Sequence, residues 1–80
     1  MKVQVFDSRG TVSRALAEIE AEGGPGLDIP ALAEEAGVST EWLHQLDAGQ
    51  LDCINLEDLE RICRVLGRSP NDITGYEADA

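Results

Sequence analysis

A glycine near the middle of residues 28–48 separates two helical patterns that lie only three residues apart. The first pattern, "LDIPALAEEAG", begins at Asp28, which is suited to cap a helix, and carries Pro30 in its first turn, where the missing N–H costs nothing. It ends at Gly37, which suits the left-handed residue that closes many helices. The second pattern, "STEWLHQLDAG", starts with Ser39 as its cap. So short a connection predicts two helices that cross at a steep angle.

The apolar residues around this junction fit that crossing. Ala33 is small where the two helices meet, and Val38 is placed to fill the angle between them. Leu43 and Leu46 are three residues apart and face inward on the second helix.

Three other segments have the apolar spacing of amphipathic helices, and they are "TVSRALAEIEAEGG", "NLEDLERICRVLG" and "SPNDITG". We expect Thr11, Asn55 and Ser69 to be their N-caps. The chain is long enough for one domain, and its single Trp, Tyr and Phe leave the core to aliphatic side chains. The fold class predicted is therefore all-α, with five helices.

The first residues, "MKVQVFD", alternate in polarity and predict a short strand or extended arm. One strand needs a partner, which we expect to be the chain's own tail or the same arm of a second subunit. The predicted organisation is an extended arm over residues 1–10, a helical domain over residues 11–75 and a frayed acidic tail over residues 76–80.

Charge is distributed unevenly along the chain, whose formal net charge is -10. The 46 residues between Arg14 and Arg61 contain no Lys or Arg and twelve acidic residues. Non-specific affinity for DNA comes mainly from basic side chains that displace counterions from phosphates, so this segment cannot supply it. The pattern fits either a solvated acidic surface or a surface that meets a basic partner.

Several functional classes lack support in the sequence. No nucleophile stands with a base and no loop is built to cradle phosphate, so we expect no enzyme and no cofactor. Cys53 and Cys63 with His44 lack a fourth ligand at zinc spacing, so we expect no metal site. Cys63 fits a small core residue, and Cys53 is expected in a loop. Without a signal or membrane-length apolar run, the expected location is cytoplasmic.

The stretch "LAEEAGVSTEWLHQLDAGQ", followed by "LEDLERICRVLGRSPNDI", resembles the lambda-repressor-like, Cro-like helix-turn-helix domain, often called the XRE family. The turn, the spacing and the second of these two stretches all match the family pattern, over about residues 12–75. The resemblance implies a compact five-helix fold and a small bacterial or phage transcription regulator. Its third helix, residues 39–48, would read the major groove of double-stranded DNA. The resemblance also implies a homodimer.

Position by position, the resemblance implies a set of DNA-contacting residues in and after the third helix, namely Ser39, Thr40, Glu41, Trp42, His44, Gln45 and Gln50. Glu41 can accept a hydrogen bond from a cytosine amine. Asp47 occupies an acidic position that is often structural in the family. From the residues themselves, Arg9 and Arg14 are the best candidates to hold flanking phosphates.

The sequence departs from the family in ways that favour an alternative function. Ile29 stands where the family commonly has Gln, and the third helix has no Arg or Lys. Ile29 and Trp42 can form an apolar patch for a protein partner, because Trp is enriched at interface hot spots. The alternative is thus an acidic interaction module, antitoxin-like or a regulator subunit, that does not bind DNA by itself.

Three features also have plainer explanations. Trp42 fits the rim of the core over Ile29, and His44 fits a polar residue that faces solvent. The stripe of arginines on the fourth helix fits a solvated face with Glu57–Arg61 and Glu60–Arg64 pairs.

Overall fold

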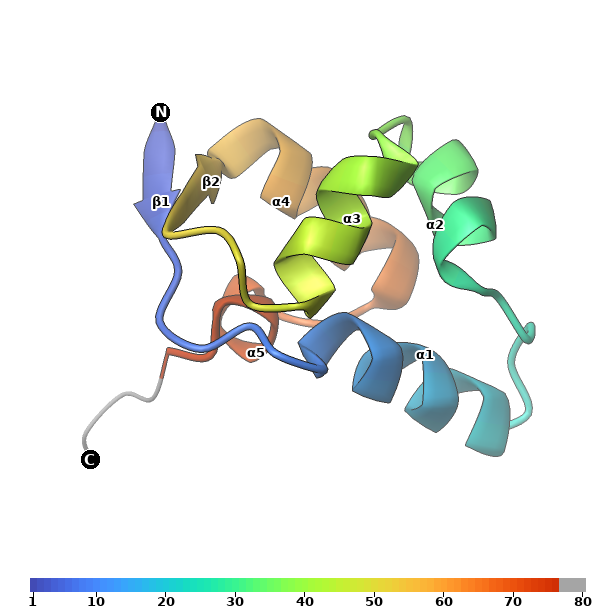
Figure 1. Cartoon of the computed structure of the whole chain (residues 1–80). Coiled ribbons are helices and arrows are strands. Elements are labelled where there is room, and N and C mark those ends of the chain that lie inside the picture. The colour runs from blue at the N-terminus through green and yellow to red at the C-terminus, as the bar shows by residue number, and fades with distance from the viewer. Residues whose placement is uncertain (77–80) are drawn as a thin grey trace.

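Five helices and a two-stranded sheet are formed by residues 1–76, the part of the chain described by the computed structural model (Figure 1). In chain order the elements are β1 (Lys2–Gln4), α1 (Thr11–Ala21), α2 (Ile29–Ala36), α3 (Thr40–Asp47), β2 (Cys53–Asn55), α4 (Leu56–Leu66) and α5 (Pro70–Thr74). This confirms the predicted five-helix fold with a short N-terminal strand. Apart from Tyr76, the expected frayed tail lies outside the described residues.

The helices enclose one aliphatic core. α2 packs against α3 and α4, while α1 packs against α3, α4 and α5. In Figure 1, α3 lies in front of α4, with α2 on one flank and α1 below. The buried apolar residues are Val5, Val12, Ala15, Leu16, Leu32, Ala33, Ala36, Leu43, Leu46, Ile54, Leu59, Ile62, Cys63, Leu66 and Ile73. Each large side chain among them stabilises the fold by about 1.5–3 kcal/mol relative to exposure.

Three of the predicted caps are confirmed. Asp28, Ser39 and Asn55 each precede a helix and accept a hydrogen bond from a backbone N–H of its first turn. These bonds, with their lengths, are Ala31 N–H to Asp28 (2.9 Å), Trp42 N–H to Ser39 (3.3 Å) and Glu57 N–H to Asn55 (2.8 Å). The local sequence therefore fixes where α2, α3 and α4 begin.

Of the other two predicted caps, Ser69 is confirmed in position and Thr11 is wrong. Ser69 precedes α5, but its side chain makes no cap hydrogen bond. The N-cap of α1 is Gly10, in a left-handed conformation with φ 71°, and not Thr11. The Thr11 hydroxyl is buried and lies within hydrogen-bonding distance of two carbonyl oxygens, those of Ser8 (2.9 Å) and Ile73 (3.0 Å). Tertiary contacts therefore override the local signal.

The partner of the N-terminal strand is neither of the two expected. β1 pairs antiparallel with β2, the segment between α3 and α4, with Val3 opposite Ile54. Cys53 accordingly lies in a strand and not in a loop. The pairing continues after β1, where the Val5 N–H donates to the Asp52 carbonyl at 2.8 Å. The N-terminal residues are thus held against the core by the chain itself.

Beyond the sheet, the N-terminal segment crosses the end of α5. The N–H groups of Phe6 and Asp7 both donate to the Thr74 carbonyl, at 2.8 and 3.0 Å. Gly75 follows with φ 77°, and a Cβ there would overlap the backbone of Asp7. Only glycine allows this approach at that conformation.

Within residues 1–76, no helix combines the length and apolar character needed to cross a lipid bilayer.

Candidate nucleic-acid interface

The turn between α2 and α3 has the geometry expected from its sequence. Gly37 adopts φ 72° and ψ 32°, and its N–H donates to the Glu34 carbonyl at 3.3 Å. The Val38 N–H donates to the Ala33 carbonyl at 3.0 Å, which satisfies a second carbonyl at the end of α2. The Val38 side chain is half-buried and packs against the core. The turn is therefore closed by both backbone and side chain.

The buried side of α3 seats the helix on the rest of the molecule. Leu43 and Leu46 are completely buried, as their spacing predicts. At the end of α3, the Ser8 hydroxyl donates to the Leu46 carbonyl at 2.5 Å. The Gly10 N–H donates to the Asp47 carbonyl at 2.8 Å. Both bonds tie the end of α3 to the segment that leads into α1.

Asp47 supplies the cap that α1 lacks in its own sequence. One carboxylate oxygen accepts from the Ser13 N–H at 3.0 Å, and the other accepts from the Ser13 hydroxyl at 2.5 Å. Ser13 lies in the first turn of α1, whose N–H groups have no partner within the helix. Gly10 provides no side chain for them. Asp47 therefore links the end of α3 to the start of α1, a structural role.

The exposed side of α3 has a shallow hollow, of about 660 Å³, that collects five of the predicted DNA-contacting residues. Its lining residues are Thr40, Glu41, His44, Gln45, Ala48 and Gln50. Glu41, His44 and Gln50 are exposed, whereas Thr40 and Gln45 are half-buried. Ala48 also lines the hollow but was not predicted from the sequence. Its place one turn after His44 on the same side of the helix is the signal that could have indicated it.

The two other predicted residues of α3 lie outside this hollow. The Ser39 hydroxyl is used as the cap of α3. Trp42 is half-buried and packs against the core, as does Ile29. The expected placement of Trp42 on the rim of the core is therefore confirmed, and much of the apolar surface of both residues is already covered.

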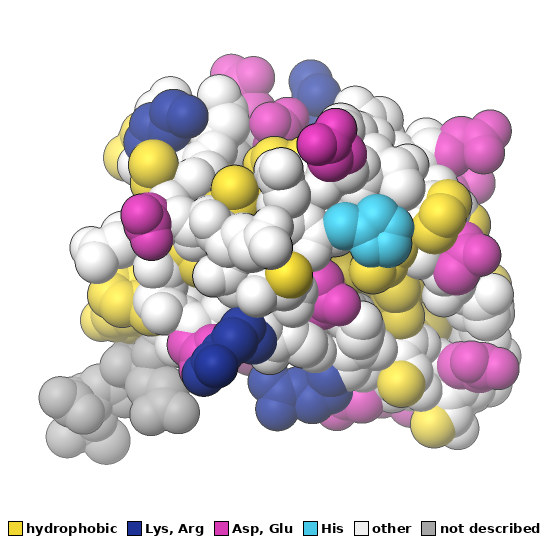
Figure 2. All heavy atoms as spheres, viewed as in Figure 1, with side chains coloured by type: hydrophobic (Ala, Val, Ile, Leu, Met, Phe, Trp, Pro, Cys, Tyr) yellow, Lys and Arg dark blue, Asp and Glu magenta, His cyan; other side chains and the backbone are white. Residues whose placement is uncertain are grey.

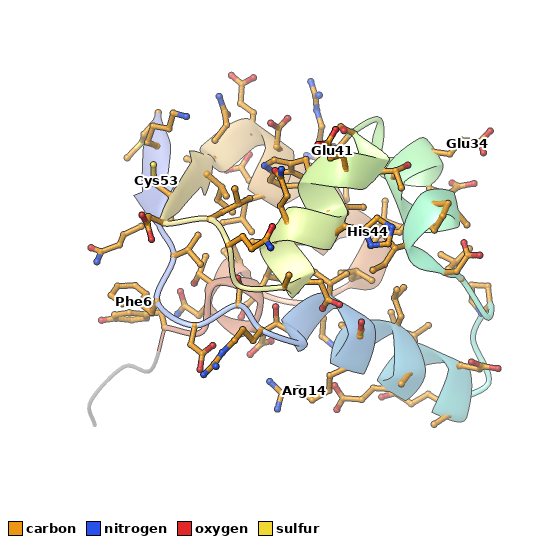
Figure 3. The ribbon with its side chains drawn as sticks, in the orientation of Figure 1. Phe6, Arg14, Glu34, Glu41, His44 and Cys53 are labelled. Atoms are coloured by element: carbon orange, nitrogen blue, oxygen red, sulfur yellow. The ribbon has the colours of Figure 1, made fainter. Side chains whose placement is uncertain are left out.

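Glu41 is the one Asp, Glu, Lys or Arg side chain among the residues that line the hollow. In Figure 2, the cyan side chain of His44 lies near the middle of the face over α3, and Lys or Arg side chains lie toward its upper and lower margins. Figure 3 shows Glu41 near the start of α3, with Arg14 on α1 beyond the other end of the helix. Glu34 projects outward from α2 at the edge of the view. Positive charge is thus found at the edge of this face and not on α3.

Arg9 and Arg14 are both exposed near the start of α1. Arg9 Nε lies 3.2 Å from a carboxylate oxygen of Asp7, and hydrogen bonds from Arg9 hold the pKa of Asp7 below its usual range. The aliphatic part of Arg9 packs over Gly49, directly after α3. Arg9 is therefore positioned beside the end of α3, although its guanidinium group is engaged with Asp7.

The arginines of α4 form other pairs than those expected. Arg61 lies 3.7 Å from Asp58, one turn earlier, and Arg68, just after α4, lies 3.5 Å from Glu22, the residue that follows α1. Among residues 1–76, neither the Glu57–Arg61 pair nor the Glu60–Arg64 pair forms, so that prediction is wrong. For Arg61, the acid three residues earlier takes the place of the acid four residues earlier.

The two cysteines differ in environment. Cys63 is buried on α4, and burial, followed by the carboxylates of Asp72 and Glu60, raises the pKa of its thiol to about 11. Cys53 is exposed on β2. In the part of the chain that the structure describes, no cluster of three His, Cys, Asp or Glu side chains is arranged for a metal ion.

Comparison with known proteins gives this surface a context. The family described as the Cro/C1-type HTH DNA-binding domain matches residues 26–79. The chain belongs to this family. The match includes α2, the turn and α3, and it confirms the lambda-repressor-like helix-turn-helix fold predicted from the sequence.

A solved structure of a regulator is also similar to the chain. It is ClgR from C. glutamicum, the clp gene regulator, with 28% sequence identity and a TM-score of 0.57. The similarity covers 88% of this chain and 86% of that chain. No curated protein matched the chain. Family and neighbour together support a DNA-binding transcription regulator.

Proposed function

We propose that this chain is a small transcription regulator that reads the major groove of duplex DNA with the exposed side of α3. The observation that carries the proposal is the hollow on that side, where Thr40, Glu41, His44, Gln45 and Gln50 meet in a member of a DNA-binding family. These side chains offer hydrogen-bond donors and acceptors of the kind that read base edges. Their opposite helix side is anchored in the core.

Phosphate contacts are assigned to the margin of this face. Arg9 and Arg14 are exposed at the start of α1, which Asp47 joins to the end of α3. A phosphate approaching Arg9 would compete with Asp7 for the guanidinium group, since that pair is exposed and weak in water. Ser39 and Gln50, at the two ends of α3, are the neutral candidates for backbone contacts. The few basic residues imply a shallow dependence of affinity on salt.

A homodimer on a two-fold site is part of the proposal. One copy offers few phosphate contacts, so two copies on half-sites about one helical turn apart would combine their modest affinities. Sedimentation with and without DNA measures this directly. We expect two protein chains per duplex, and a single chain at every concentration would contradict the dimer.

The test of the function is selection from a pool of random duplexes at low salt, followed by anisotropy titration of the enriched sequence. We expect a sequence to enrich and to bind more tightly than mixed-sequence DNA. Failure to enrich any sequence, with no binding at tens of micromolar protein, would contradict the proposal.

The alternative of an acidic interaction module is supported by the 46-residue segment without Lys or Arg. In that case a basic protein partner would contact the face that includes Ile29 and Trp42. Capture from the native lysate tests this alternative. A partner that no longer binds after the change Trp42→Ala, together with no DNA binding, would favour it over the regulator.

A further inference from the structure

Building on the proposed function, we infer that Glu41 selects cytosine at one position of the DNA site. Glu41 is exposed in the hollow on α3, and in residues 1–76 it takes part in none of the three ion pairs and none of the side-chain hydrogen bonds. Its carboxylate is therefore free to accept a hydrogen bond from outside the chain.

The chemistry of the hollow makes Glu41 distinct from its neighbours. Thr40 and Gln45 can each donate or accept, and neutral His44 can do both through its two ring nitrogens. An ionised carboxylate can only accept. Glu41 is thus the single acceptor-only side chain in the hollow, and it requires a donor on the base edge that it meets.

Only two groups in the major groove provide such a donor, the amines of cytosine and adenine. Adenine presents its N7 acceptor beside the amine, and that lone pair would repel a carboxylate. Cytosine itself has no acceptor beside its amine, so the only neighbouring acceptor is O6 of the paired guanine, whereas the adenine amine lies between N7 and O4 of the paired thymine. Guanine and thymine present acceptors where Glu41 needs a donor. Cytosine is therefore the base that satisfies Glu41 with the least repulsion.

The absence of Lys and Arg from residues 15–60 strengthens this assignment. Bidentate contact of a basic side chain with guanine is the commonest specific contact in the major groove, and α3 cannot make it. A carboxylate in the first turn also stabilises the N-terminus of α3, but that role does not depend on which base is bound. The two roles are separable by experiment.

The experiment compares the sites selected by the unchanged chain, by Glu41→Gln and by the matched control Glu34→Gln. Both variants remove one negative charge from an exposed helix position, but Glu34 does not line the hollow and projects outward from α2 at the edge of the view (Figure 3). We expect the unchanged chain and Glu34→Gln to enrich cytosine at the same position. Glu41→Gln should enrich adenine there, because a glutamine amide can contact adenine N6 and N7 together.

The size of the effect is measured on the enriched site. Replacing its cytosine by thymine should weaken binding of the unchanged chain by about 5- to 150-fold, the range of one good base contact. Replacing it by 2-pyrimidinone, which lacks the amine, should also weaken the unchanged chain. The affinity of the Glu41→Gln variant should fall little when the cytosine is replaced by either base.

Two results would overturn the inference, and they differ from failure of the function. If Glu41→Gln enriches the same bases as the unchanged chain, DNA binding stands and Glu41 does not select cytosine. If the unchanged chain binds the site with 2-pyrimidinone as tightly as the site with cytosine, Glu41 does not contact the amine. If the unchanged chain enriches nothing, the proposed function fails and this inference fails with it.

Discussion

The two helices α3 and α4 both bury leucines in the core, but their exposed sides carry different charged residues. α3 buries Leu43 and Leu46, and α4 buries Leu59 and Ile62 among others. On its exposed side α3 carries Glu41 and no Lys or Arg. α4 carries Arg61 and Arg64 together with three acids, Glu57, Asp58 and Glu60, and Arg68 follows its end. The arginines alone would direct DNA to α4, whereas the proposed function places DNA at α3. The helix that is proposed to read DNA is therefore not the helix that carries the arginines.

The largest expected effect tests whether the buried sides are equivalent. Leu43→Ala and Leu59→Ala should each lower the free energy of unfolding by about 2–5 kcal/mol, because both side chains are completely buried. For a small domain this is a large part of the total stability. Urea unfolding followed by the fluorescence of Trp42 measures both. A decrease below about 1 kcal/mol for either leucine would contradict its place in the core.

A smaller effect separates the two links to α1. Asp47→Ala removes the carboxylate that caps α1 from α3, and should cost about 0.5–2 kcal/mol. Arg68→Ala removes an ion pair to Glu22 whose carboxylate is exposed, and should cost less than about 1 kcal/mol. Equal costs in thermal or urea unfolding would contradict the assignment of Asp47 as the stronger link.

The next comparison concerns variants that change the affinity for DNA and leave the stability of the fold nearly unchanged. Arg9→Ala combined with Arg14→Ala should weaken binding to all sequences alike and lower the salt slope by about 2, one for each phosphate that is no longer neutralised. Arg61→Ala combined with Arg64→Ala is the matched control, with the same change in net charge. Anisotropy at several salt concentrations gives both slopes. A larger change in the α4 control would place the phosphates beside α4 and not at the start of α1.

The smallest effect is chemical and concerns the buried side of α4. Burial raises the pKa of the Cys63 thiol to about 11, so at pH 8 it stays protonated and unreactive toward alkylating reagents. Cys53 is exposed on β2. Mass spectrometry of the native protein after brief iodoacetamide treatment should find one modified cysteine, at Cys53. Equal modification of both before unfolding would contradict the burial of Cys63.

The fold could be predicted from the sequence wherever its signals are local. Asp28, Ser39 and Asn55 mark the starts of their helices because each cap bonds to the turn that follows it. The cap of α1 could not be found this way. The carboxylate that accepts from its first turn is that of Asp47, which lies 34 residues after Ser13 in the chain. Thr11, the local candidate, is instead buried among backbone carbonyls.

The strand β2 and the exact composition of the site were also beyond sequence reasoning. β2 is only three residues long, and Asn55 is both its last residue and the cap of α4. Such a strand exists because β1 pairs with it, and pairing between distant segments has no local signal. In the hollow, the resemblance to the family predicted Thr40, Glu41, His44, Gln45 and Gln50. The burial of Trp42 against the core depends on packing that the spacing alone left open.

The most direct test of whether α3 reads DNA is a map of amide chemical shifts in the ¹⁵N-labelled protein as duplex DNA is added at low salt. We predict the largest changes over residues 40–50 and at the start of α1, including Arg9 and Arg14. We predict small changes at Arg61 and Arg64 on α4 and at Arg68 just after it. Large changes along α4 with α3 unaffected would contradict the claim that α3 reads DNA, and would show that charge and not position in the fold determines where DNA binds.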